Sequence, residues 1–167
     1  CINFIKVQFE GGFISSKDMK CEDSINIVNS QGKIDKIKIE NSYHDGLDID
    51  ISDLEIQDID ISNSKNDCLD LSFGNYQFNY IKLENCSDKA ISVGEKSILN
   101  AKNILANDSN YGIVSKDSSI VTIESLKSYN NKFCISAYKK KQEFDGGLLK
   151  IDFMECKDYL KKMDMDN

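Results

Sequence analysis

The chain of 167 residues is long enough for one domain with a sizeable core, and its 40% hydrophobic and 29% charged residues are ordinary for a soluble globular protein. The net charge of −7 argues against nucleic acid as a partner, because a phosphate backbone needs a basic footprint. It is compatible with divalent cations and with neutral or cation-bridged ligands. No apolar run approaches the length of a membrane span, so no membrane insertion is expected.

The first segments of the chain are strand-like but irregular. Ile2–Gly12 has the character of an early coil, and Phe13–Lys20 is less regular. The chain begins at Cys1 and not at Met, from which we expect an excised part of a longer chain with other domains.

From about Cys21 onward, one pattern recurs every 22 residues. It combines a column of asparagines, a column of small residues and, directly after each small residue, a column of aliphatic residues. The asparagines are Asn41, Asn63, Asn85 and Asn107; the small residues are Ser24, Gly46, Cys68, Ala90, Gly112 and Cys134; the aliphatic residues are Ile25, Leu47, Leu69, Ile91, Ile113 and Ile135. A fixed period of this length indicates a solenoid.

Within each repeat, apolar and polar residues alternate, as in Leu47–Ile51, and this is the period of a β-strand. A coil of this length, with two or three short strands and intervening turns, matches one rung of a parallel β-helix. We therefore predict an all-β fold, a right-handed single-stranded parallel β-helix over residues 1–157. Its regular coils span 21–137, a charged loop spans 139–147, and the polar tail 158–167 is expected to be a short helix or a frayed end.

The asparagine column predicts a ladder. An Asn at an inward-facing turn can bond the turn backbone and stack its amide on the amides above and below. Asn85 and Asn107 also stand in N-x-S glycosylation sequences, but internal amides would not be glycan acceptors.

The six cysteines are predicted to be mainly small buried thiols that fill a tight column. Cys68 and Cys134 lie three coils apart, which is roughly 14 Å at about 4.8 Å per coil. A disulfide needs Cα atoms within about 7 Å, so this pair is excluded. No cysteine or histidine spacing indicates zinc.

Strand alternation places two columns of side chains on one outer face. The first is Asn26, Asp48, Asp70, Ser92, Val114 and Ser136, and the second is Val28, Asp50, Ser72, Gly94, Lys116 and Tyr138. Carboxylates one coil apart repel by roughly 3.5 kcal/mol at an effective dielectric of 20, so they need a cation, backbone donors or shifted pKa values. Asp48, Asp50 and Asp70 are therefore candidate Ca²⁺ ligands. The alternative is that each carboxylate caps its own turn.

Three side chains on this face are candidate catalytic residues. Lys116 is a candidate base, since a lysine near a bound cation can have a lowered pKa. Tyr138 is a candidate acid, or a ring on which a sugar stacks. Lys89 follows a second acidic column of Asp23, Asp45 and Asp67. The alternative for Lys116 is an ordinary solvated side chain.

An ordered series of motifs carries a resemblance to a known family. The motifs are Cys21–Val28, His44–Asp50, Asn66–Ser72, Asp88–Ser97, Gly112–Ser119 and Ala137–Phe144. Over roughly residues 2–147 the series resembles the right-handed β-helix (pectate-lyase-like) region of bacterial surface or secreted proteins, some of which also carry a CotH-type kinase-like domain. This resemblance implies an extracellular or cell-surface location.

The wider superfamily is similar to pectate lyases, alginate lyases and epimerases, and polygalacturonases. In the lyases, Asp residues hold Ca²⁺ and a Lys or Arg removes the proton next to a uronate carboxylate. The resemblance thus implies Ca²⁺ on Asp48, Asp50 and Asp70, with Lys116 as the base. The chain departs from this pattern because it has no Arg, and the Asp trio of polygalacturonases has no clear counterpart.

Two functions follow from these observations. The first is a module that binds carbohydrate or polysaccharide through the acidic face without catalysis. The second is a Ca²⁺-dependent polysaccharide lyase or epimerase that acts on an acidic glycan. The missing Arg favours the first, and the acidic columns beside Lys116 favour the second.

Overall fold

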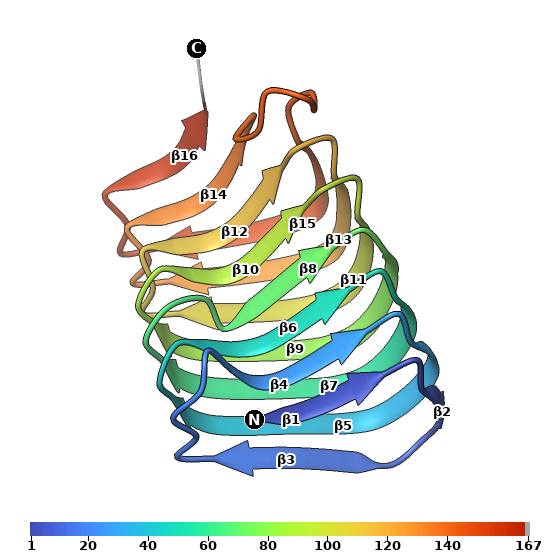
Figure 1. Cartoon of the computed structure of the whole chain (residues 1–167). Coiled ribbons are helices and arrows are strands. Elements are labelled where there is room, and N and C mark those ends of the chain that lie inside the picture. The colour runs from blue at the N-terminus through green and yellow to red at the C-terminus, as the bar shows by residue number, and fades with distance from the viewer. Residues whose placement is uncertain (166–167) are drawn as a thin grey trace.

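The computed structural model describes residues 1–165, and every regular element in that range is a β-strand (Figure 1). The strands stack as parallel coils and form two sheets. The short-strand sheet consists, in spatial order, of β1 (Ile2–Ile5), β4 (Asp23–Val28), β6 (Asp45–Asp50), β8 (Leu69–Ser72), β10 (Lys89–Gly94), β12 (Tyr111–Lys116), β14 (Phe133–Tyr138) and β16 (Lys161–Met165).

The long-strand sheet carries the return path of each coil. It runs from β15 (Leu148–Lys157) through β13 (Ile120–Tyr129), β11 (Ile98–Asn107), β9 (Asn75–Cys86), β7 (Asp53–Ser64) and β5 (Gln31–Ser42) to β2 (Gln8–Glu10), with β3 (Phe13–Lys17) also paired to β5. No helix of residues 1–165 is long and apolar enough to cross a membrane.

The register confirms the predicted parallel β-helix and its coil length. Leu47 lies beside Leu69, and Leu69 lies beside Ile91, so equivalent residues 22 apart are strand neighbours. The Ile2–Gly12 segment is an earlier coil, as predicted, because β1 pairs with β4. Successive coils therefore bring together side chains that are far apart in the sequence.

The core fills the space between the two sheets. Inward residues of the short-strand sheet, such as Leu47 and Ile49, pack with inward residues of the long-strand sheet, such as Ile59 and Ile61, and all four are fully buried. Burying one such side chain contributes roughly 1.5–3 kcal/mol. The intervening Asp48 and Asp50 must then face outward, as the alternation predicts.

The asparagine ladder exists for Asn41, Asn63 and Asn85, but Asn107 is paired with Glu84 and lies outside it, and the predicted inward position is wrong. Asn63 Nδ2 donates to Asn41 Oδ1 at 2.9 Å, and Asn85 Nδ2 donates to Asn63 Oδ1 at 2.7 Å. All three side chains are exposed and have a positive φ of 58–61°. Asn fits there because it adopts the left-handed region more readily than other non-glycine residues. Burial therefore gives no argument against a glycan on Asn85.

Four of the six cysteines form disulfides, so the prediction that the cysteines are mainly free thiols is wrong. Cys1 is bonded to Cys21, and Cys68 is bonded to Cys86, with Cα–Cα distances of 5.6 and 5.4 Å. Cys68 is thus paired across its own coil, and the exclusion of a Cys68–Cys134 bridge is confirmed. The prediction considered only cysteines stacked in one column and missed a partner on the opposite sheet.

The C-terminal segments also differ from expectation. The tail 158–167 was expected to be a short helix or a frayed end, but Lys161–Met165 forms β16 and pairs with β14, while residues 166–167 lie outside the described residues. The charged loop 139–147 folds back along the corner of the coil. The backbone N–H groups of Lys140 and Lys141 in this loop donate to Asp117 Oδ1.

Candidate functional site

The acidic face predicted from the sequence lies on the outer side of the short-strand sheet. Asp48 is the strand neighbour of Asp70, and Asp70 is the strand neighbour of Ser92. The second column runs beside the first, since Asp50 neighbours Ser72. We call the outer side of β6, β8, β10, β12 and β14 the acidic face; strand pairing aligns its side chains into the two predicted columns.

Asp48 has the most strongly shifted pKa of the carboxyl groups on this face. Burial, followed by the charges of Asp50 and Asp70, raises the pKa of Asp48 to about 8. Burial also raises the pKa of Asp50, and Asp70 and Glu95 act in the same direction. At neutral pH Asp48 is therefore largely protonated and can donate a hydrogen bond.

Asp70 occupies the centre of the first column with incomplete hydrogen bonding. Its side chain is half-buried, and its Oδ1 atom has no hydrogen-bond partner among the described residues. A buried carboxylate oxygen without a donor costs free energy unless a ligand, water or cation supplies the missing contact. The Oδ1 atom of Asp70 thus lies buried between Asp48 and Ser92 without a protein donor.

Lys116 reaches back toward this acceptor. Only 5% of Lys116 is exposed, and its Nζ donates to Ser92 Oγ at 2.8 Å. The side chain passes over Gly94, where an added Cβ would lie 2.8 Å from Lys116 Cε. Because Gly94 lacks a side chain, the lysine can lie flat along the sheet. The fold consequently brings the Nζ atom of Lys116 to Ser92, which is the strand neighbour of Asp70.

Lys89 is an ion-pair residue in this structure. Its Nζ lies 3.4 Å from Asp67 Oδ1 and also contacts Asp88. Burial opposes the charged form of Lys89, but the two carboxylates outweigh it and raise its pKa. Asp67 is 4% exposed, and burial raises its pKa to about 6 against the influence of Lys89. A lysine held in the protonated state is poorly suited to act as a base.

Tyr138 lies at the C-terminal end of the face and is half-buried. Burial raises its pKa, and the charge of Lys89 opposes that shift. Nearby, Tyr111 and Phe133 stack on each other with ring centroids 4.7 Å apart. These rings give the face an apolar part beside its charged part.

The second acidic column, Asp23, Asp45 and Asp67, serves mainly to hold its turns. Asp45 Oδ1 accepts from the backbone N–H of Asp67 and from Asn66 Nδ2, both at 2.8 Å. Asp67 Oδ1 accepts from the backbone N–H of Lys89 at 3.0 Å. Asp45 and Asp67 therefore each cap the turn of the next coil and not their own turn.

Glu95 and Asp117 form an anchor that sequence reasoning missed. Glu95 accepts from Ser72 Oγ at 2.7 Å and pairs with Lys141 Nζ at 2.6 Å. Asp117, fully buried, accepts from the backbone N–H groups of Lys140 and Lys141 at 2.7 Å. Through these contacts the charged loop 139–147 docks on the edge of the acidic face. The 22-residue spacing of Glu95 and Asp117 was the available signal.

The predicted Ca²⁺ ligands have suitable chemistry but no preformed cluster. Carboxylate oxygens are the ligands that Ca²⁺ prefers, and Asp70 Oδ1 is a free donor atom. Within residues 1–165, however, no three His, Cys, Asp or Glu side chains converge on one point as a metal-binding group. A cation at Asp48, Asp50 and Asp70 would have to draw these side chains together.

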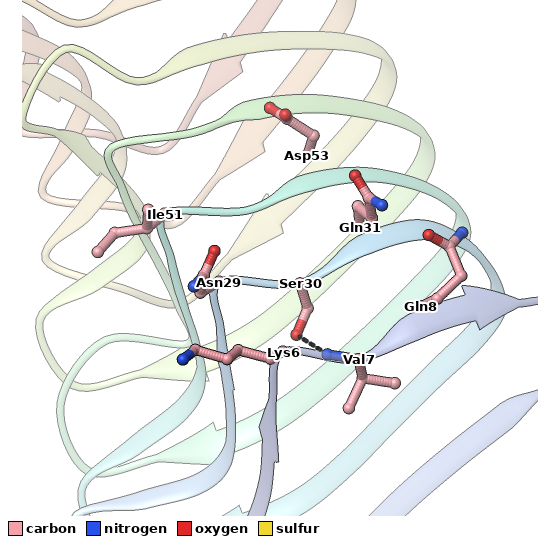
Figure 2. Close-up of a pocket in the computed structure, with 8 residues that line it drawn as sticks. All are labelled: Lys6, Val7, Gln8, Asn29, Ser30, Gln31, Ile51 and Asp53. Carbon is pink, nitrogen blue, oxygen red and sulfur yellow. Dashed lines mark hydrogen bonds between the residues drawn. The ribbon is translucent and has the colours of Figure 1, made fainter.

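A separate hollow of about 340 Å³ lies at the N-terminal corner of the coils (Figure 2). It is lined by Lys6, Val7, Gln8, Asn29, Ser30, Gln31, Ile51 and Asp53. Ser30 Oγ accepts from the backbone N–H of Val7 at 3.0 Å (Figure 2). Its two charged residues, Lys6 and Asp53, are exposed, so the hollow lacks the half-buried acids of the acidic face.

Comparison of the chain with protein-family models, with curated proteins and with solved structures finds no match. The geometry of the acidic face is therefore the basis on which a function is assigned to the chain.

Proposed function

We propose that the acidic face binds carbohydrate, as a module of a surface or secreted protein. The observation that carries this proposal is the row formed by Asp48, Asp70 and Ser92, with the ammonium of Lys116 at its end. The row combines a protonated carboxyl donor at Asp48 with carboxyl oxygen acceptors at the half-buried Asp70, and the buried Nζ of Lys116 holds Ser92 at its end. Sugar hydroxyls both donate and accept hydrogen bonds, so a polysaccharide chain fits such an alternation.

The aromatic residues beside this row support the same proposal. Tyr111 and Phe133 offer ring surface on the same sheet, and Tyr138 stands at the end of the second column. Flat apolar rings next to hydrogen-bonding groups suit a ligand whose ring faces are apolar and whose edges are polar. A neutral glycan needs no further charge, whereas an acidic glycan needs a cation such as Ca²⁺ between its carboxylates and Asp70.

The two disulfides support an extracellular location. Cys1–Cys21 and Cys68–Cys86 are bonds of a kind that persist in oxidising compartments. This agrees with the resemblance to the pectate-lyase-like regions of bacterial surface proteins, which we keep as part of the proposal.

Binding is favoured over the alternative of a Ca²⁺-dependent lyase or epimerase. A catalytic base must come within about 3 Å of the proton that it removes. Lys116 is buried and its Nζ is bonded to Ser92, while Lys89 is bonded to Asp67 and Asp88. Neither ammonium is placed to reach a polysaccharide without rearrangement.

The proposal is tested by calorimetric titration with neutral and uronate polysaccharides, with and without Ca²⁺. We expect binding to at least one polymer, weakened at least tenfold by Asp70→Asn, which corresponds to about 1.4 kcal/mol. Asp60→Asn is the matched control, because Asp60 faces outward from β7 on the long-strand sheet. Equal affinities of the two variants, or no binding to any polymer, would contradict the proposal. Ultraviolet-absorbing unsaturated products would favour the lyase alternative instead.

A further inference from the structure

Two cysteines at the C-terminal end of the coil face each other as free thiols. Cys134 lies in β14 and is fully buried, whereas Cys156 lies in β15 and is half-buried. The Cys134 thiol lies close enough to Cys156 to contribute to the raised pKa of that thiol. They belong to opposite sheets of the solenoid, so a bond between them would cross the lumen.

The preceding coil explains why these two side chains meet. Gly112 precedes Cys134 in its column, and Ser128 is the strand neighbour of Cys156. A Cβ built on Gly112 would lie 2.7 Å from Ser128 Oγ, so side chains at both positions of one coil come into direct contact. One coil further, both positions carry a thiol.

An existing disulfide shows that this column accepts a bridge across the lumen. Cys68 stands in the same column as Cys134, three coils earlier, and is bonded to Cys86 of the long-strand sheet. Its Cα–Cα distance of 5.4 Å lies within the usual range for disulfides. Cys86 lies three residues after Leu83, which occupies the strand position equivalent to Cys156, so the precedent is that a cysteine in this column directs its side chain toward the opposite sheet.

We propose that Cys134 and Cys156 are a third disulfide site, oxidised by a small-molecule disulfide such as oxidised glutathione. The Cys156 thiolate attacks the disulfide of the oxidant, forming a mixed disulfide and releasing one thiolate. The Cys134 thiolate then attacks the Cys156 sulfur and releases the second. The two cysteines lose two protons and two electrons in total, and the oxidant takes up both electrons and leaves as two thiols.

The exposure of the two thiols sets the order of these steps. Cys156 is the accessible one, so it meets the oxidant first, and Cys134 resolves the mixed disulfide. Burial, together with the interaction with Cys134, raises the pKa of Cys156. Since the thiolate is the attacking species, closure should be slow at neutral pH and about tenfold faster for each unit of higher pH between 7 and 9.

The bridge would fasten the last complete coil. Residues 134–156 enclose the charged loop 139–147, which is held at its other side by Glu95 and Asp117. Beyond the bridge, the solenoid end presents an apolar hollow of about 280 Å³ lined in part by Ile135, Leu149 and Met154. We expect oxidation to raise the melting temperature by about 4–10 °C, the range expected for a loop of this size in a domain of this size.

The test is alkylation in denaturant, followed by intact mass and tryptic mapping, after the folded protein is incubated with oxidised or reduced glutathione at pH 8.5. The reduced sample should carry two alkyl groups and the oxidised sample none. Trypsin should then yield one cross-linked species that joins residues 133–139 to residues 151–157. Two alkyl groups after oxidation, or a link from Cys134 to any other cysteine, would overturn the proposal.

Two variants keep the test independent of misfolding. Cys156→Ser places at this position the residue that its neighbour Ser128 already provides, and Cys134→Ala introduces the residue found in the same column at Ala90. Each variant should retain one thiol that forms no intramolecular bridge and should lose the oxidation-dependent rise in melting temperature. An unchanged rise in either variant would show that the stabilisation has another source.

Discussion

The raised pKa of Asp48 predicts that the protein loses stability as the pH rises. The ordinary pKa of this carboxyl is 3.8, and in the folded protein it is about 8. Between these values the folded state binds more protons than the unfolded state, so the free energy of unfolding decreases with increasing pH. The stabilisation is fully present below pH 4 and is lost as the pH passes through 8.

The structure gives the size of the effect. Each pH unit between the two pKa values corresponds to about 1.4 kcal/mol, so the interval from pH 6 to 8 gives at most about 3 kcal/mol. Asp48 keeps some contact with water, and Asp50 and Asp70 share in the shift. We therefore expect about half of that value, roughly 1.5 kcal/mol, or a decrease in melting temperature of about 3–6 °C for a chain of this size.

The assay compares thermal unfolding at pH 6 and pH 9 for the wild type, Asp48→Asn and Asp60→Asn. Because Asp67 has a pKa of about 6, its contribution is largely complete at the lower pH. Asp48→Asn should remove most of the pH dependence and melt above the wild type at pH 9, and Asp60→Asn should behave like the wild type. A wild type with equal melting temperatures at the two pH values would refute the reasoning, as would an Asp48→Asn variant with undiminished pH dependence.

Substitutions at three further positions test the contacts that shape the face and the coil, each by urea denaturation. Gly94→Ala should destabilise the protein by about 1–3 kcal/mol, because the new Cβ would lie 2.8 Å from Lys116 Cε, and an unchanged midpoint would contradict the described path of the lysine. Asn63→Ala should lower the free energy of unfolding by about 1–2 kcal/mol, since it removes two ladder hydrogen bonds and places Ala at a φ of 61°. Asn63→Gly should lower it by less, because glycine adopts a positive φ freely, and a larger loss for Asn63→Gly would be inconsistent with this account. Cys86→Ser removes a native disulfide and should cost about 2–4 kcal/mol, so a variant as stable as the wild type would count against the bridge.

The sequence predicted the fold because the repeat itself carries the register. Leu47, Leu69 and Ile91 are equally spaced, and the strand pairs join these same residues. The alternation around Leu47 also predicted that Asp48 and Asp50 point outward. Strand alternation was sufficient within β6 but failed at Ile51, which follows the strand at a φ of 50° and is 57% exposed.

The remaining errors concern interactions between different columns. Spacing along the chain cannot reveal that Cys68 faces Cys86 on the opposite sheet, or that the ladder asparagines stand outside the turn. It also cannot reveal that Lys116 lies flat over Gly94, because that path depends on a missing side chain one coil earlier. The docking of Lys141 on Glu95 similarly depends on how the loop folds back.

The most direct test of the proposed carbohydrate-binding face is carboxyl footprinting with a water-soluble carbodiimide, in the presence and absence of a polysaccharide that binds. Labelling of Asp50 and Asp70 should decrease when the polysaccharide is bound, because the ligand would cover their half-buried carboxylates. Labelling of Asp60 on the opposite sheet should stay the same. Protection of Asp60 with unchanged labelling of Asp50 and Asp70 would contradict the proposed binding face.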